Sequence, residues 1–268
     1  MSAAIEFFGL MDDDAFPVEA AALELSALDH HQASVTDYLG VVADMAARVS
    51  AIGSDARTGA RQAEILADVI YGEHGFTGDR DTYDAAVNAD MIRVFDRRRG
   101  LPISIAIIYV AVARQVGWTA TVLNLPGHVL VQVGPDDPAI IDVFDGGASV
   151  DPAQLDVALG IEKGVARGVA QKTFGMSARD VIVRLLNNQA GRAEQEGDHE
   201  RARTVYERMT KIAPSAVHGW WALAQYQLMS GAADDARATL TSLLDVTRDR
   251  DLRAQITAAI ENVATAQD

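Results

Sequence analysis

The sequence contains no cysteine among its 268 residues, which excludes disulfides, thiolate metal sites and a cysteine nucleophile. It is also short of basic residues, because 23 basic side chains stand against 38 acidic ones and the formal net charge is -15. A surface with this average charge repels phosphate backbones and anionic membranes, so neither nucleic acid nor a membrane surface is an expected partner. The longest apolar run, Ile105 to Ala113, is about half of what a bilayer-spanning helix needs.

The first residues, "MSAAIEFFGLMDDDAF", have no basic region and turn acidic within a short distance, which is unlike a secretory signal. We therefore expect a cytoplasmic protein. The composition, 49% hydrophobic and 23% charged with only 7 prolines, is typical of a folded chain with a sizeable core. The length favours a main domain with an appendage.

The first third of the sequence is predicted to be helical. Apolar residues recur three and four positions apart in the segments 17–28, 35–52 and 58–75, and each pattern is typical of an amphipathic helix. A loop rich in Gly, Asp and Asn follows, "GFTGDRDTYDAAVN", and leads to a short helix around Ala89 to Phe95.

A buried helix is predicted from Pro102 to Gly117. Proline suits the first position of a helix, and glycine is typical just after the last. Between Ile103 and Ala113 only Ser104 and the Tyr109 hydroxyl are polar, so this helix is expected to be covered on nearly all sides.

The periodicity then changes to that of strands. The segments 119–125, 128–133 and 139–144 are short and rich in β-branched residues, and their short connections predict an antiparallel meander packed on the buried helix. The fold class is therefore α+β. A short helix is predicted over 151–162, and the segment 164–176 receives no assignment.

The last ninety residues contain a repeat signal. Gly197 and Gly231 are 34 positions apart, as are Ala202 and Ala236, and four helices are predicted near 178–196, 199–212, 215–229 and 232–246. This spacing is typical of tetratricopeptide repeats, which bind or pack against proteins and perform no chemistry; a plain helical bundle is the alternative.

Three aromatic residues of this region are candidates for contact with a protein partner: Trp220, Trp221 and Tyr226. Neighbouring residues on a helix point about 100° apart, so one tryptophan can fill the core while the other lies nearer the surface. The alternative is that both tryptophans pack inside the protein.

The predicted topology brings together the parts of an acyl-transfer site. A nucleophile at a helix N-terminus is activated by the partial positive charge there, a histidine on an adjacent strand can take its proton, and a carboxylate on the next strand can orient the imidazole. His128 and Asp142 occupy the two strand positions. Each residue taken alone is more often structural, because histidine bonds backbone readily and aspartate favours turns.

Four segments resemble the SirB family of transglutaminase-like proteins: "GFTGDRDTYDAAVN", "RRRGLPISIAIIYVAVARQVGW", "NLPGHVLVQV" and "IDVFDGG". The resemblance covers nearly the whole chain and is strongest from Gly75 to Gly147. It implies a transglutaminase-like, papain-like α+β core over residues 1–175, with helices before the sheet, and a tetratricopeptide-like helical region over 176–268.

The resemblance also shows a departure at the nucleophile. Enzymes of this fold carry Gly-x-Cys at the start of the buried helix, and alignment on Gly100 and Gly117 places Pro102 where the thiol would be. Ser104 is two positions further on, which turns its side chain by about 200° around the helix. An oxygen nucleophile, either Ser104 or a water activated by His128, therefore remains as the alternative to a chain without catalysis.

No metal or cofactor is expected. The histidines lack the i, i+4 spacing with a third ligand that indicates zinc, and His128 with Asp142 supplies only two ligands. A papain-like cleft would instead gather further polar side chains that can bind a peptide or a small molecule: Tyr83, Asn88, Arg97, Arg98, Asn124 and Asp145.

Two functions follow as hypotheses. One is a regulatory or scaffolding protein that has lost the nucleophile and binds partners through its helical repeat and a cleft lined by His and Asp. The other is a hydrolase or acyl transferase, which requires an oxygen nucleophile within hydrogen-bond reach of His128.

Overall fold

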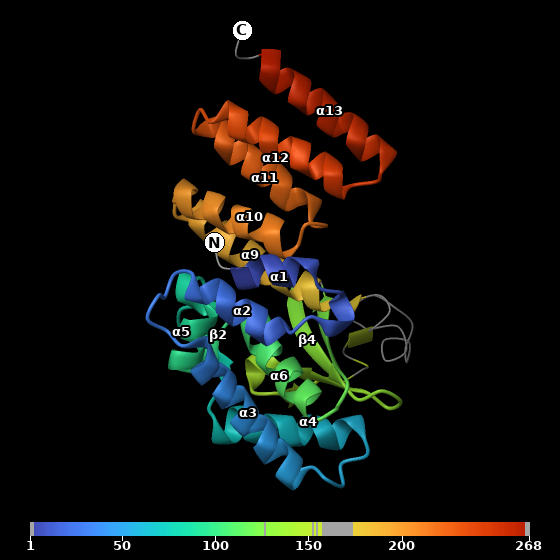
Figure 1. Cartoon of the computed structure of the whole chain (residues 1–268). Coiled ribbons are helices and arrows are strands. Elements are labelled where there is room, and N and C mark those ends of the chain that lie inside the picture. The colour runs from blue at the N-terminus through green and yellow to red at the C-terminus, as the bar shows by residue number, and fades with distance from the viewer. Residues whose placement is uncertain (1–2, 126, 152, 154, 157–173, 266–268) are drawn as a thin grey trace. The chain divides into compact units, whose positions relative to one another are not determined.

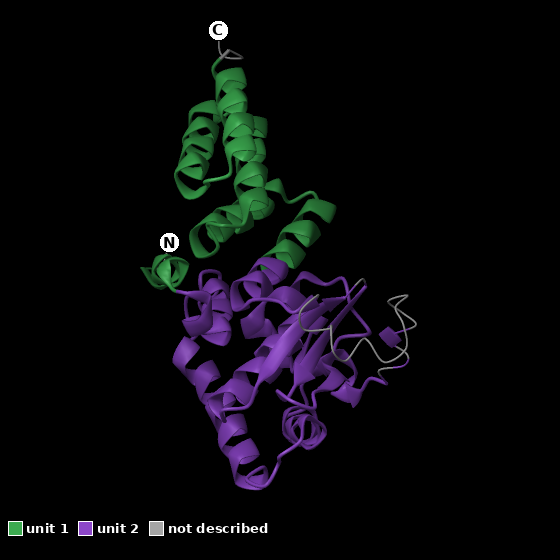
Figure 2. Cartoon of the chain, turned by 90° about the vertical axis from the view of Figure 1, so that its right-hand side faces the viewer, with its two compact units in different colours: residues 1–11, 186–268 green, residues 12–185 purple. Residues whose placement is uncertain are grey.

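The computed structural model describes residues 3–125, 127–151, 153, 155–156 and 174–265 (Figure 1). The chain forms two compact units, one of residues 12–185 and one of residues 1–11 and 186–268 (Figure 2). The division between 185 and 186 falls inside helix α9 (Ala178–Gln195). The domain boundary predicted between residues 175 and 176 stays a prediction.

The larger unit begins with a short 3-10 turn, η1 (Asp13–Ala15), and three helices, α2 (Val18–Ala27), α3 (Val35–Ile52) and α4 (Gly59–Ala67). Hydroxyl caps determine where α3 and α4 start: the Ser34 side chain accepts from the Asp37 amide, and Thr58 accepts from the Arg61 amide. A π-helical turn, η2 (Asp68–Glu73), continues directly from α4. The three predicted helices are confirmed.

The loop after η2 is tied back to the chain by a short parallel pair, β1 (Thr77–Gly78) with β2 (Arg99–Gly100). Between them lie a 3-10 turn, η3 (Ala86–Ala89), and α5 (Met91–Arg97). The predicted helix at 89–95 therefore begins two residues later, because the Asp90 side chain accepts from the Arg93 amide and caps α5.

Helix α6 (Pro102–Gln115) is the central helix of this unit. Pro102 occupies its first turn, and every residue from Ile103 to Ala113 is buried. Gly117, with φ of 74°, adopts the left-handed conformation that ends the helix. The predicted buried helix is confirmed.

Four antiparallel strands form the sheet in the order β3 (Ala120–Leu125), β4 (His128–Val133), β5 (Ala139–Asp142) and β6 (Ala148–Ser149). The strand predicted over 139–144 ends at Asp142, because that side chain caps the 3-10 turn η4 (Val143–Asp145). β6 was not predicted.

The two faces of the sheet have different neighbours. Val122 lines a small cavity with Ile107 and Val110 of α6, while Ile141 lies opposite α4. Side chains alternate between faces along a strand, so the other face carries a separate leucine-rich cluster. That cluster consists of Leu123, Leu125, Leu130, Ile140 and Leu155. The helix predicted over 151–162 and the unassigned segment 164–176 lie mostly outside the described residues.

The smaller unit contains α1 (Ala3–Leu10), the end of α9, and helices α10 (His199–Ile212), α11 (Val217–Met229), α12 (Ala233–Val246) and α13 (Arg250–Thr265). The four predicted repeat helices are confirmed within two residues, while α1 and α13 were not predicted. Gly197 and Gly231, with φ of 73° and 77°, end α9 and α11. Trp220, Ala224, Ala236 and Leu240 belong to the core between α11, α12 and α13.

No helix in the described part of the chain has both the length and the apolarity to cross a membrane.

Candidate functional site

The start of α6 is held against the η3 turn. The Leu101 amide donates to the Asn88 carbonyl at 3.0 Å, and the Ser104 hydroxyl donates to the same carbonyl at 2.9 Å. Gly100 allows this close packing, since a Cβ there would lie 2.9 Å from the Val94 side chain. Ser104 is fully buried, so its hydroxyl proton is engaged by a backbone acceptor and not by an imidazole.

His128 begins β4 directly after the hairpin turn and is exposed. It pairs with Leu125 across the hairpin, and Gly127, with φ of 77°, makes the tight turn. Among the residues that the structure describes, no side chain or backbone group forms a hydrogen bond with the imidazole. The ring is therefore open to solvent.

Asp142 has a local partner for its carboxylate. One of its oxygens accepts from the Phe144 amide at 2.9 Å and from the Asp145 amide at 3.3 Å. The strand register places His128 and Asp142 on the same face of the sheet, the face that carries the leucine-rich cluster. Helix α6, with Ser104, packs on the opposite face. Two members of the expected site, His128 and Asp142, thus lie on one face of the sheet. The third, Ser104, lies on the helix that packs on the opposite face, and its hydroxyl is bonded to the Asn88 carbonyl.

Asp79, which the sequence pattern did not single out, is a highly connected polar group of the unit. Its carboxylate accepts from the Asp81 amide, from the Thr82 amide and hydroxyl, and from Arg97 at 2.6 Å. Its side chain is 2% exposed, against 33% for Arg97. Burial alone would raise the pKa of Asp79, but the hydrogen bonds from Thr82 and Arg97 outweigh it and lower the pKa far below its ordinary value.

Asn88 joins this carboxylate to the start of α6. Its side-chain oxygen accepts from Arg97 at 2.8 Å, and its amide donates to the carbonyls of Thr82 and Tyr83. Because the Asn88 carbonyl also receives the Ser104 hydroxyl, one continuous network extends from Asp79 to Ser104. A buried network with every member satisfied fixes local geometry. It leaves Asn88 and Arg97 already occupied by partners within the chain.

The other residues predicted for the cleft do not all lie together. Arg98, with φ of 59°, closes α5, and its guanidinium lies 4.5 Å from the centre of the Phe76 ring. Burial lowers the pKa of Arg98. Asn124 is exposed on β3, opposite Val129.

Tyr83 and Asp145 meet around Phe144. The Tyr83 and Phe144 rings pack edge to face at 5.8 Å, Arg80 lies over the Phe144 ring, and Arg80 pairs with Asp145 at 2.8 Å. Phe144 in turn rests on Gly78, where a Cβ would overlap the ring. This exposed cluster covers the β1 strand from outside.

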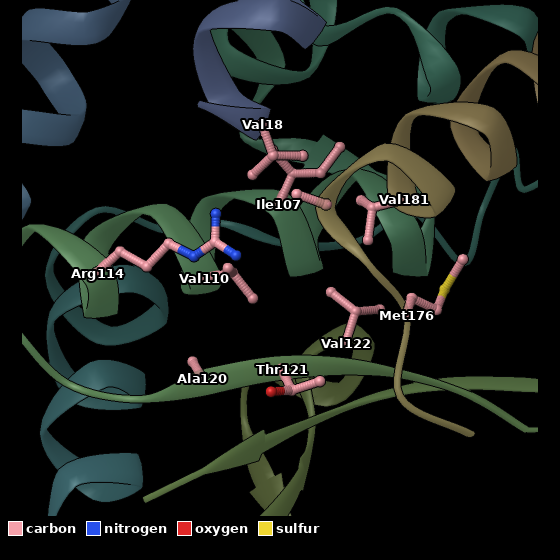
Figure 3. Close-up of a pocket in the computed structure, with 10 residues that line it drawn as sticks. Val18, Ile107, Val110, Arg114, Ala120, Thr121, Val122, Met176 and Val181 are labelled. Carbon is pink, nitrogen blue, oxygen red and sulfur yellow. The ribbon is translucent and has the colours of Figure 1, made fainter. Parts of the chain in front are cut away.

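A cavity lies between α6, β3 and the segment that enters α9 (Figure 3). Its volume is about 40 Å³, and its lining is apolar apart from Thr121 and Arg114. Arg114 donates to the Phe16 carbonyl. A space of this size holds a water molecule or two, so it excludes a peptide or a cofactor.

The three aromatic residues predicted to contact a partner have partners within the smaller unit. Trp220 is 8% exposed and donates to the Pro214 carbonyl, while Trp221 is half-buried against the core of α11, α12 and α13. The hydroxyls of Tyr226 and Tyr206 both donate to the same oxygen of Glu194, each at 3.0 Å, and their rings stack. Burial, followed by the bond to Glu194, raises the pKa of Tyr206.

Comparison with known proteins decides the family. The model of the transglutaminase-like superfamily matches residues 36–187, more than half of the chain, and that of the tetratricopeptide repeat matches residues 193–260. The chain belongs to the transglutaminase-like superfamily.

Two similar proteins have no function in their names. The UPF0162 protein of Xylella fastidiosa strain 9a5c is 30% identical over 182 residues, which are 66% of this chain and 65% of that protein. The homologue from strain Temecula1 is 32% identical over 151 residues, 54% of each chain. The matches therefore span less than two thirds of each relative's length.

A third similar protein contains only a part of this chain. F-box only protein 21 of Mus musculus is 38% identical over 78 residues, which are 29% of this chain and 12% of that protein. The match therefore covers only a small part of a much longer protein.

Across residues 3–125, 127–151, 153, 155–156 and 174–265, no group of three or more His, Asp or Glu residues is arranged to hold a metal ion. The connected polar residues that the sequence pattern did not single out are Asp79 and Thr82 in the larger unit and Glu194 and Tyr206 in the smaller one. Asp79 precedes Arg80-Asp81-Thr82, and an aspartate before such a polar stretch is a signal for a side-chain-capped turn that could have identified it.

Proposed function

We propose that this transglutaminase-like protein is non-catalytic and acts as a regulatory or scaffolding protein that binds a protein partner through its helical repeat. One observation carries the proposal: no cysteine is present, and the only hydroxyl in the first turn of α6, that of Ser104, is buried and donates to the Asn88 carbonyl. A serine nucleophile needs its base within hydrogen-bond reach.

The hydrolase or acyl transferase alternative requires His128 to activate Ser104 or a water. Exposure of the imidazole is compatible with contact to water. Against it, the Asp142 carboxylate is engaged by the amides of Phe144 and Asp145, and no hydrogen bond among the described residues lets it orient the imidazole. The support therefore favours the non-catalytic protein.

An assay for acyl transfer tests the proposal. Purified protein is incubated with activated esters, with amide substrates and with a fluorescent primary amine as acceptor, next to the variant His128→Ala. We expect equal, background rates for both proteins. A rate that the His128→Ala variant loses, with unchanged thermal unfolding, would contradict the proposal and support the enzyme.

The partner side of the proposal rests on the repeat. Tetratricopeptide repeats present extended surfaces to proteins, and α11 exposes two large apolar side chains near Trp221, with Leu228 43% and Met229 61% exposed. We place the partner contact on this face, next to Trp221 and Tyr226. A photo-crosslinking residue at Leu228 should capture a discrete partner, whereas the same residue at the exposed Ser242 of α12 should not.

Two finer assignments belong to the same proposal. We assign the chain to the SirB branch of the superfamily, supported by the four segments between Gly75 and Gly147. We also place the protein in the cytoplasm. We further propose that the cleft residues bind a ligand, either a peptide or a small molecule.

A further inference from the structure

A groove lies between α4 and the end of the sheet in the larger unit. Its volume is about 420 Å³, within the range of about 300–1,000 Å³ typical of ligand sites. Three alanines of α4 form one wall, Ala60, Ala63 and Ala67, and residues of β5 and β6 form the other, including Ile141 and Ser149. None of the residues predicted for the cleft lines this groove.

Small side chains let another main chain approach both walls. Gly147 lies between them, with φ of 83°, and a Cβ there would come within 2.7 Å of the Ala67 side chain. Its backbone is therefore in direct contact with α4 and cannot carry a side chain into the groove. Alanine methyl groups and the Gly147 backbone thus form part of the groove lining.

The adjoining strand β6 offers backbone hydrogen-bonding groups. It is the last strand in the sheet order, its residues Ala148 and Ser149 are exposed, and no described strand pairs with its outer edge. An edge strand beside a groove is the arrangement by which many domains bind extended peptides: the main chain pairs with the edge, and alternate side chains enter the groove.

The rim of the groove is acidic. Glu64 and Asp68 both line it; Arg61 forms an ion pair with Glu64 at 2.8 Å and attracts Asp68 only from a longer distance. Asp68 has no ion pair among the described residues. Tyr71, 49% exposed, follows Asp68 by three positions, and its ring packs against Gly146, the neighbour of Gly147 in the groove lining. A carboxylate next to an aromatic ring favours a cationic side chain.

We propose that this groove binds an extended peptide segment of another protein, with a lysine or arginine side chain of that segment paired with Asp68. The groove shares no residue with the face of α11 or with the cleft residues. The proposal therefore stands whether or not the repeat binds a partner.

Fluorescence polarisation with the full chain tests the proposal. The probes are short fluorescein-labelled peptides with a central lysine or arginine flanked by alanine, valine and serine, and matched peptides with a central glutamate. Saturable binding of the basic peptides alone is the expected result. Absence of saturation by every basic peptide, or equal binding of the acidic ones, overturns the proposal. Displacement of the basic peptides by butylamine at equal concentration also overturns it, since the ligand would then be a simple amine.

Two variants locate the binding. Asp68→Asn should weaken the affinity for basic peptides about threefold to fivefold, as expected for one exposed ion pair, while Asp44→Asn on α3 changes the same net charge and should leave it unchanged. Ala60→Trp should fill the groove and remove saturable binding, and Ala47→Trp on exposed α3 is its control. Thermal unfolding monitors folding. Unchanged affinity in Asp68→Asn, or in a folded Ala60→Trp, means that the peptide binds elsewhere.

Discussion

The polar side chains around the start of α6 are buried and hydrogen-bonded, whereas the one at the start of β4 is exposed. At α6, Ser104, Asn88 and Asp79 are buried, and each is bonded to another group of the chain. At β4, His128 is exposed and has no described partner. Burial makes the difference, because an unsatisfied polar group in the interior is costly while water satisfies an exposed one. A transglutaminase-like core can therefore keep polar residues at its helix start for stability alone.

The largest expected effect comes from the buried network. Asp79→Asn leaves the Arg97 guanidinium without its charged partner, and we expect the free energy of unfolding to fall by about 2–4 kcal/mol. Urea unfolding measures the change. Asp145→Asn is the matched control, because its pair with Arg80 is exposed on both sides and contributes about 0–1 kcal/mol. Equal losses in the two variants would show that the network contributes nothing beyond a surface pair.

The same carboxylate predicts an acid dependence. The pKa of Asp79 is lowered in the folded state, so its stabilisation is fully present above its ordinary pKa of 3.8 and is lost as the pH falls below that value. Urea unfolding of the wild type should lose stability more steeply than that of Asp79→Asn below about pH 4. Between about pH 5 and 7, a range that starts roughly one unit above that pKa, the difference in unfolding free energy between the wild type and Asp79→Asn should be constant. Parallel curves throughout would argue against the lowered pKa.

A smaller effect is expected at Asp142. Its carboxylate accepts from the amides that open η4, so Asp142→Ala should cost about 1 kcal/mol in the free energy of unfolding. Asp142→Asn keeps a capping oxygen and should cost only a few tenths of a kcal/mol. Thermal unfolding distinguishes the two. If asparagine destabilises as much as alanine, the charge of Asp142 matters and a cap does not explain it.

The smallest effect is expected at His128. The imidazole is exposed and forms no described hydrogen bond, so His128→Ala should change the free energy of unfolding by less than about 0.5 kcal/mol. Urea unfolding at neutral pH checks this. A loss comparable to that of Asp142→Ala would show that His128 has a structural partner and would remove the contrast between the two regions.

Much of the fold could be predicted from local patterns. Pro102, the apolar run after it and Gly117 defined α6, and the 34-residue spacing of Gly197 and Gly231 indicated the repeat. β5 ended early because Asp142 turns the chain with its own side chain, and strand propensity does not register that competition. Helix α1 was missed because it is short and lies beyond the segments with clear periodicity.

The site was less predictable for a physical reason. The partner of Ser104 is a backbone carbonyl, that of Asn88, and a backbone acceptor leaves no trace in residue identity. Asp79 and Arg97 are 18 positions apart, and the pairing of β1 with β2 brings their segments together. Residue types could indicate the positions at which proteins of this fold carry an active site. They could not show which hydrogen bonds the side chains at these positions form.

One comparison tests the central claim most directly: the unfolding free energy and the ester-cleavage rate of Ser104→Ala, measured on the same sample next to the wild type. The account predicts that stability falls by about 1 kcal/mol, because the hydroxyl bond to Asn88 is lost, while the rate stays at background. Unchanged stability together with the loss of a wild-type rate would contradict it, since Ser104 would then act as a nucleophile.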